Sequence, residues 1–238
     1  MPFASIDELE SALAGASYLP DRGLSTALYL SLKLEKPLLL EGEAGVGKTE
    51  AAKAIAQALG ARLIRRPLLE AIESEEPVVL LIDEIDRADE EFEAFLLEVL
   101  SDYQITIPEL GTIRARRRPP VVLTSNRTRE LHDALKRRCL YHWIPFPDAA
   151  RERLILRAYA PGLDQAAADA LVNAITRVRG EKLLKRPGIA ETIDWAQGAS
   201  VLATEGTPWP EALKRSLGLL LKEQEDVERA EAVLEAVR

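Results

Sequence analysis

The feature that most constrains this chain is the octapeptide Gly-Glu-Ala-Gly-Val-Gly-Lys-Thr at residues 42–49. It matches G-x-x-x-x-G-K-[S/T] in full, follows the apolar run Pro37–Glu41, and opens a stretch of helical composition, Lys48–Leu59. In a strand, glycine loop and helix in this order, backbone N–H groups can curl around a phosphate, and the helix N-terminus favours its negative charge. The sequence therefore predicts a nucleotide phosphate site on a parallel α/β sheet.

Each part of this loop has a predicted task. Lys48 should reach the β- and γ-phosphates of ATP, and the Thr49 hydroxyl should bind Mg²⁺. The predicted nucleotide-binding residues are Gly42, Glu43, Ala44, Gly45, Val46, Gly47, Lys48, Thr49 and Glu50.

The rest of the chain falls into two parts. Further strands are predicted at Arg62–Arg65, Val78–Ile82, Val121–Thr124 and Tyr141–Ile144, with helices between them and a hairpin over Ile105–Ile113. From residue 148 only helices are predicted, at 148–159, 164–179, 187–203, 209–217 and 220–237. Strands alternating with helices indicate a parallel sheet. We therefore expect an α/β nucleotide-binding domain over residues 1–147 and an all-helical lid over 148–238.

Two acids follow the predicted strand Val78–Ile82. Asp83 is expected to hold the Mg²⁺ together with Thr49, and Glu84 to orient and polarise an attacking water. The same two acids could instead cap the helix that follows.

The next predicted strand ends in Thr124-Ser125-Asn126. Asn126 could hold the water or the γ-phosphate, although Asn also favours turns for its own sake. Lys136-Arg137-Arg138 ends a short helical stretch, Leu131–Arg138, where basic side chains suit a helix C-terminus in any case.

Composition restricts the class of protein. The chain has 31 Lys+Arg against 39 Asp+Glu, a net charge of −8, which argues against broad binding to nucleic acid or anionic membranes. Its apolar runs are strand-sized, whereas a membrane helix needs about 20 residues. With one cysteine, Cys139, and neither a basic start nor an apolar leader, we expect a cytoplasmic protein without a membrane span.

These motifs together resemble a ring-forming AAA+ ATPase. More narrowly, the sequence is similar to the MoxR family through Asp21-Arg22-Gly23, Asp83-Glu84-Ile85-Asp86-Arg87-Ala88, Ile107-Pro108-Glu109-Leu110-Gly111 and Thr124-Ser125-Asn126-Arg127. Within that family it looks most like the CoxD-like branch, associated with maturation of carbon monoxide dehydrogenase and related molybdenum hydroxylases.

The resemblance implies a hexameric or similar ring with ATP between neighbours. Asn126 would be the sensor-1 residue. Arg138 would be the arginine finger that reaches the next subunit, with Arg137 as the second choice. Arg186 would be the sensor-2 residue, with Lys185 as the second choice. The implied partners are a client protein, further copies of the chain and a von Willebrand factor A domain protein. The hairpin near Pro108 would contact substrate or a ring neighbour.

One stretch departs from the family pattern. The family carries an additional helix and pore-facing loop where this chain passes from Arg62-Leu63-Ile64-Arg65-Arg66 directly into Pro67. About 20 to 30 residues are missing relative to that pattern, since connections inside α/β units are otherwise short. If the protein truly lacks them, threading of a substrate through a central pore is in doubt. The alternative is a disordered stretch that the sequence leaves out, which is favoured because little chain remains here for a parallel crossover.

We therefore expect an ATP hydrolase that remodels or matures a client protein, such as a metalloenzyme during cofactor assembly. Two alternatives are a small-molecule P-loop kinase and a nucleotide-gated switch with little turnover. The helices that follow the sheet domain, and the set Asp83, Glu84 and Asn126, favour the hydrolase over the kinase. Glu84 counts against the switch, because nucleotide binding alone does not need that carboxylate.

Overall fold

The computed structural model describes residues 3–65, 68–108, 111–160 and 162–235. The chain divides into two compact units, which we treat separately. The sheet unit contains the described residues of Met1–Glu43 and Lys48–Pro145, and the helical unit contains those of Phe146–Arg238 with the loop Ala44–Gly47.

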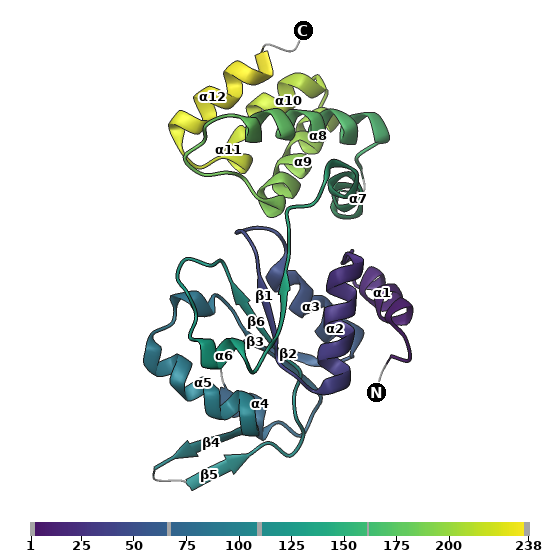
Figure 1. Ribbon diagram of the computed structural model, residues 1–238. Helices are drawn as coiled ribbons and strands as arrows, with labels where there is room; N and C mark the ends of the chain where they lie inside the picture. Colours follow the sequence, from purple (N-terminus) through teal and green to yellow (C-terminus); the bar gives the residue numbers. More distant parts are fainter. Residues whose placement is uncertain (1–2, 66–67, 109–110, 161, 236–238) are drawn as a thin grey trace. The chain divides into compact units, whose positions relative to one another are not determined.

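The sheet unit is built on five parallel strands in the order β2-β3-β6-β1-β7 (Figure 1). Every residue of β1, β3 and β6 is buried, which is why continuous apolar runs predicted them. All five strands confirm predicted ones: β2 and β3 have the predicted bounds, and the ends of β1, β6 and β7 differ from them by one residue. Their bounds are β1 (Leu38–Glu41), β2 (Arg62–Arg65), β3 (Val78–Ile82), β6 (Val121–Ser125) and β7 (Leu140–Trp143).

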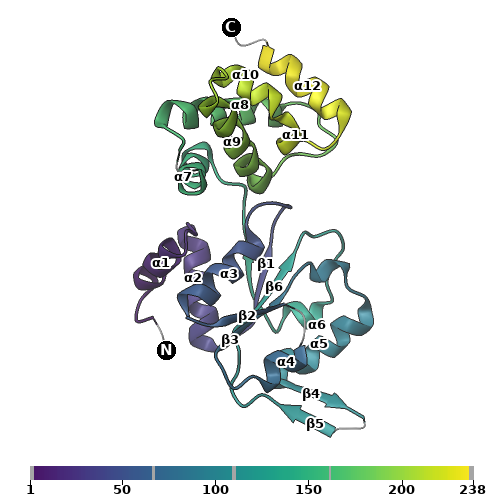
Figure 2. The same ribbon diagram turned by 180° about the vertical axis from the view of Figure 1, so that it is seen from behind.

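Helices cover both faces of this sheet (Figure 2). One face carries α1 (Ile6–Gly15), α2 (Arg22–Leu34) and α3 (Lys48–Ala58). The other carries α4 (Leu68–Glu73), α5 (Glu90–Asp102) and α6 (Asp133–Lys136), whose apolar side chains form one core with those of the strands. The predicted helix Leu131–Arg138 is wrong at both ends, because His132 already caps α6 and the chain turns after Lys136.

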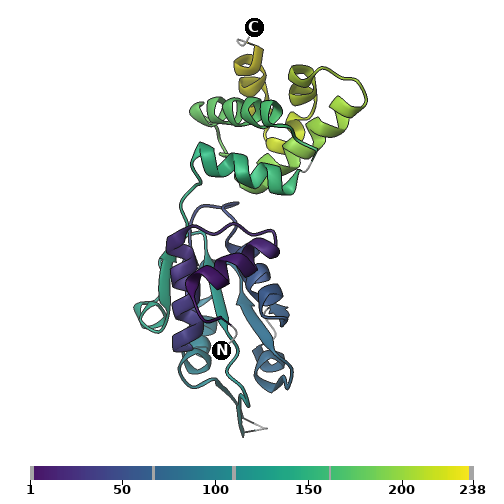
Figure 3. The same ribbon diagram turned by 90° about the vertical axis from the view of Figure 1, so that its right-hand side faces the viewer.

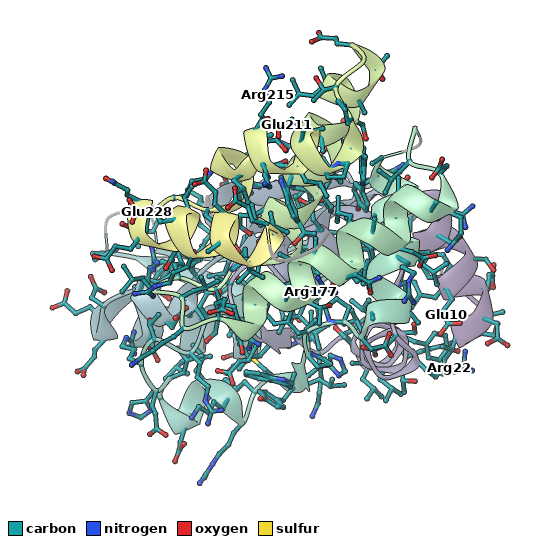
Figure 4. The ribbon with its side chains drawn as sticks, turned by 90° about the horizontal axis from the view of Figure 1, so that it is seen from above. Glu10, Arg22, Arg177, Glu211, Arg215 and Glu228 are labelled. Atoms are coloured by element: carbon teal, nitrogen blue, oxygen red, sulfur yellow. The ribbon has the colours of Figure 1, made fainter. Side chains whose placement is uncertain are left out.

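The N-terminal helices α1 and α2 pack against each other in front of the sheet (Figure 3). Ser5 caps α1, its hydroxyl accepting the Glu8 N–H at 3.1 Å. Arg22 at the start of α2 forms ion pairs with Asp7 (2.5 Å) and Glu10 (3.2 Å) of α1 (Figure 4). These pairs are exposed, so their contribution to stability is small.

The connection from β2 to the parallel strand β3 is completed by α4, a helix the sequence analysis did not predict. The twelve-residue connection 66–77 is long enough for a parallel crossover, so the argument that too little chain was available is wrong. The junction 66–67, where a family segment was expected, lies outside the described residues.

The predicted hairpin is confirmed as β4 (Gln104–Ile107) and β5 (Gly111–Arg114), paired antiparallel with Ile105 opposite Ile113. It lies at the end of the sheet unit away from the carboxyl end of β1 (Figure 1).

The helical unit contains α7 (Ala149–Tyr159), α8 (Gln165–Gly180), α9 (Ile189–Thr204), α10 (Trp209–Arg215), α11 (Leu217–Leu220) and α12 (Gln224–Glu235). The predicted helices 209–217 and 220–237 are wrong in their division. Leu221 has an extended backbone (φ −120°, ψ 144°), which ends α11, and its side chain is buried in the core. In the described ranges, no helix is both long and apolar enough to cross a membrane.

Candidate active site

The loop after β1 brings Lys48 and Thr49 to the carboxyl end of the sheet. Gly45 (φ +78°) and Gly47 (φ +93°) take left-handed backbone conformations that other residues adopt only with strain. Lys48 begins α3 and is only 6% exposed. Its ammonium group donates to the carbonyl oxygens of Gly42 (2.8 Å) and Glu43 (2.7 Å), so the lysine closes the loop onto itself.

Thr49 and Asp83 meet across the sheet, although 34 positions separate them. The Thr49 Oγ1 lies 2.9 Å and 3.2 Å from the two carboxylate oxygens of Asp83. Oxygen ligands of this kind suit Mg²⁺, which commonly binds one or two protein groups and completes its shell with water and phosphate. The pair fits that cation, whereas the described residues contain no group of three or more His, Cys, Asp or Glu that could enclose a metal by themselves.

Glu84 and Asn126 also come together, from the ends of β3 and β6. The Asn126 amide donates to Glu84 Oε1 at 3.2 Å. Glu84 has a left-handed backbone (φ 51°, ψ 51°), and its N–H donates to Thr124 Oγ1 at 2.9 Å. Because the strands are parallel, their carboxyl ends share one edge, and the geometry brings these two residues beside Asp83.

Thr124 is one of two residues whose part in this arrangement the sequence analysis missed. Its hydroxyl donates to Asp83 Oδ1 at 2.5 Å while accepting the Glu84 N–H, so it ties both acids to β6. Its place at the end of a buried strand, one position before Ser125-Asn126, was the available signal.

Asp86 is the other. It is 2% exposed and accepts hydrogen bonds from the N–H groups of Asn126 (3.2 Å) and Thr128 (2.9 Å) and from the Thr128 hydroxyl (2.6 Å). Burial by itself would raise the pKa of Asp86, but these hydrogen bonds outweigh it and lower the pKa.

Electrostatics at the site centre on Lys48. Burial lowers the pKa of its ammonium group, because the charge loses water. Four carboxylates act in the opposite direction and favour the charged form, those of Asp86, Asp83, Glu84 and Glu41. An anion placed at Lys48 would favour the charged form further.

The basic residues preceding β7 differ in their surroundings. Arg138 donates to Ser101 Oγ (2.5 Å) and to the Ala134 carbonyl (2.7 Å). Arg137 is exposed, and within the described residues its side chain has no hydrogen bond or ion pair.

The remaining predicted residues are not part of this cluster. Glu50, in the first turn of α3, forms an exposed ion pair with Lys53. Arg186 belongs to the helical unit, where its guanidinium lies 3.4 Å from the Arg179 carbonyl oxygen, and the Lys185 N–H donates to Asp226 at 3.0 Å.

Comparison with known proteins agrees with this geometry. Residues 38–146 match the model of the ATPase family associated with various cellular activities (AAA). No curated protein matches the chain.

Solved structures extend the likeness to most of the chain. The AAA domain of FIGL-1 in complex with ADP is similar over 91% of this chain and 88% of its own, at 16% identity and a TM-score of 0.53. The Holliday junction branch migration motor RuvB of Thermotoga maritima is similar over 86% of this chain and 68% of its own, at 22% identity and a TM-score of 0.57. A mutant of the same RuvB is similar over 87% of this chain and 70% of its own, at 22% identity and a TM-score of 0.59.

At these identities the likeness shows the fold. The chain therefore has the AAA+ fold, a parallel sheet followed by a helical region, and its residues 38–146 match the AAA ATPase family model.

Proposed function

We propose that this protein is a MoxR-like AAA+ ATPase of the CoxD-like branch, which hydrolyses ATP with Mg²⁺ and uses the energy to remodel or mature a client protein. The observation that carries hydrolysis is the contact of the Asn126 amide with Glu84 Oε1 (3.2 Å), beside the contact of Thr49 with Asp83 (2.9 Å). A carboxylate held by a neutral amide suits the orientation of water next to a phosphate group.

The residues then divide the work. Lys48 binds the β- and γ-phosphates, and Thr49 with Asp83 holds the Mg²⁺. When bound, the cation neutralises charge that develops on the phosphate oxygens. The Glu84 carboxylate accepts a hydrogen bond from the attacking water, and the Asn126 amide orients this carboxylate. Positioning and charge neutralisation supply most of the rate in such a reaction.

A complete site needs a second subunit in this proposal. Arg138 is the first candidate for the finger that reaches a neighbour's nucleotide, and Arg137 is the second. Arg138 would have to leave Ser101 and the Ala134 carbonyl, whereas Arg137 is already exposed. Arg186, with Lys185 behind it, is the proposed sensor-2 residue of the helical unit. The client, a ring of copies and a von Willebrand factor A domain partner rest on the family resemblance.

The deciding experiment measures ATP turnover per subunit over a wide range of protein concentration, with particle mass recorded on the same samples. We expect the specific rate to rise as rings form, because a neighbour completes each site. A constant rate in a monomer, together with a phosphorylated product from an added metabolite, would identify a kinase. Nucleotide binding without turnover at any concentration would identify a switch.

A further inference from the structure

The loop that carries Asn126 is held by two buried carboxylates, one at the end of β1 and one in the 3-10 helix Ile85–Arg87 that follows β3. On one side, Asp86 accepts three hydrogen bonds from Asn126 and Thr128, as described above. Two of the three come from backbone N–H groups, so Asp86 fixes the path of the main chain on both sides of residue 127.

On the other side stands Glu41, the last residue of β1, which is 6% exposed. It lies directly opposite Ser125 in the pairing of β1 with β6, and its Oε1 accepts the Ser125 hydroxyl at 3.2 Å. The Ser125 Oγ in turn accepts the Arg127 N–H at 3.0 Å.

These contacts hold the loop in a conformation that its sequence does not favour. Arg127 has φ 60°, a left-handed backbone that is costly for a residue other than glycine. Such a conformation persists only where its surroundings impose it. The Arg127 N–H donates to Ser125 Oγ, and the N–H groups of its two neighbours, Asn126 and Thr128, donate to Asp86.

Neither carboxylate forms a salt bridge within the described residues. Both favour the charged form of Lys48, but the Lys48 ammonium group makes its hydrogen bonds to the carbonyl oxygens of Gly42 and Glu43. Burying an acid without a basic partner is unfavourable unless hydrogen bonds compensate. The donors that do so here, those of Ser125, Asn126 and Thr128, all belong to the loop 125–128.

We propose that Asp86 and Glu41 are positioning residues that clamp the loop 125–128 and thereby aim the Asn126 amide at Glu84. Glu41 acts through Ser125, and Asp86 acts directly on the main chain. Because Glu41 also precedes Gly42, the clamp joins the start of the phosphate loop to the Asn126 loop. The inference deepens the proposed hydrolysis and rests on it for its kinetic consequence.

The first test needs no turnover. Hydrogen exchange is measured on peptides covering residues 121–130 in the wild type and in Asp86→Asn, Glu41→Ala, Glu41→Gln and Ser125→Ala. We expect the amides of the loop to exchange at least 5-fold faster in Glu41→Ala and Ser125→Ala, with Glu41→Gln between them and the wild type because it keeps an acceptor oxygen. Peptides from α5 should not change. The matched control is Ser31→Ala, which removes another buried hydroxyl, one bonded to the Lys36 carbonyl oxygen.

The second test separates positioning from general stability. In the same variants, kcat for ATP should fall about 10-fold while KM stays within about 2-fold, since the phosphate loop is intact. Wild-type exchange in the loop of all four variants would overturn the clamp, and so would equal losses in kcat and affinity. If the wild type itself does not turn over ATP, the proposed function fails, and the exchange data still decide whether the clamp exists.

Discussion

Glu84 is the single residue on which the proposed hydrolysis most depends. Glu84 has a left-handed backbone, its N–H donates to the Thr124 hydroxyl, and its carboxylate accepts the Asn126 amide. Its side chain makes no capping hydrogen bond to the 3-10 helix that follows. The alternative in which Asp83 and Glu84 only cap the next helix is therefore not supported. The ion pair of Glu84 with Arg87 (3.2 Å) is exposed, so it contributes little to stability.

Replacing Glu84 by Gln should leave ATP binding near the wild-type level and lower kcat by about 100-fold or more, because the amide cannot accept a proton from water. Binding is measured by titration with a fluorescent ATP analogue, and turnover by phosphate release. Glu91→Gln, an exposed acid at the start of α5, serves as the control and should match the wild type. Normal turnover in Glu84→Gln would remove this residue from the chemistry.

At the scale of elements, the sequence analysis identified the strands and the phosphate loop because burial on both faces and glycine spacing are local signals. The contacts of Asp86 and Thr124 at the site, and that of Glu41 with Ser125, could not be predicted, since the partners lie 40 or more positions away and depend on strand register. The helix α4 was missed because six residues are too few to show a period. The division of the last helices was wrong because core packing of Leu221, rather than periodicity, ends α11.

Within the helical unit, Arg179 connects α8 to α7 and α9. Its guanidinium binds both oxygens of Glu152 on α7 (2.9 and 3.0 Å) and Thr192 Oγ1 on α9 (2.9 Å). It also donates to the Pro187 carbonyl (3.0 Å) and stacks over Phe146. Burial raises the pKa of Glu152 and lowers that of Arg179, while each partner opposes the shift of the other.

Arg179→Met should lower the free energy of unfolding of the helical unit by about 3–5 kcal/mol, because it leaves the Glu152 charge buried without a partner. The double variant with Glu152→Leu should lose less, since no charge is then stranded. Urea unfolding followed by circular dichroism measures both. Arg177→Ala, the exposed arginine on the same helix (Figure 4), should change stability by no more than about 0.5 kcal/mol. A double variant less stable than the single one would contradict this reading of the pair.

At the scale of the whole molecule, the proposed site is shared between copies, and two inactive variants should therefore complement each other. Arg138→Ala keeps Lys48 and lacks the finger, whereas Lys48→Ala lacks the phosphate contact and keeps the finger. In randomly mixed rings at equal amounts, about one quarter of the head-to-tail interfaces pair an intact Lys48 with an intact arginine. Turnover should thus rise toward about a quarter of the wild-type rate on mixing, although each variant alone is inactive.

The matched comparison is Arg137→Ala mixed with Lys48→Ala under the same conditions. If only this mixture regains activity, the finger is Arg137, which agrees with its exposed side chain. If neither mixture gains activity at any ratio while particle mass shows mixed rings, both arginines act within their own subunit. The hydrogen bonds of Arg138 to Ser101 and to the Ala134 carbonyl would then be its working contacts, and ring assembly would have to regulate the enzyme by another route.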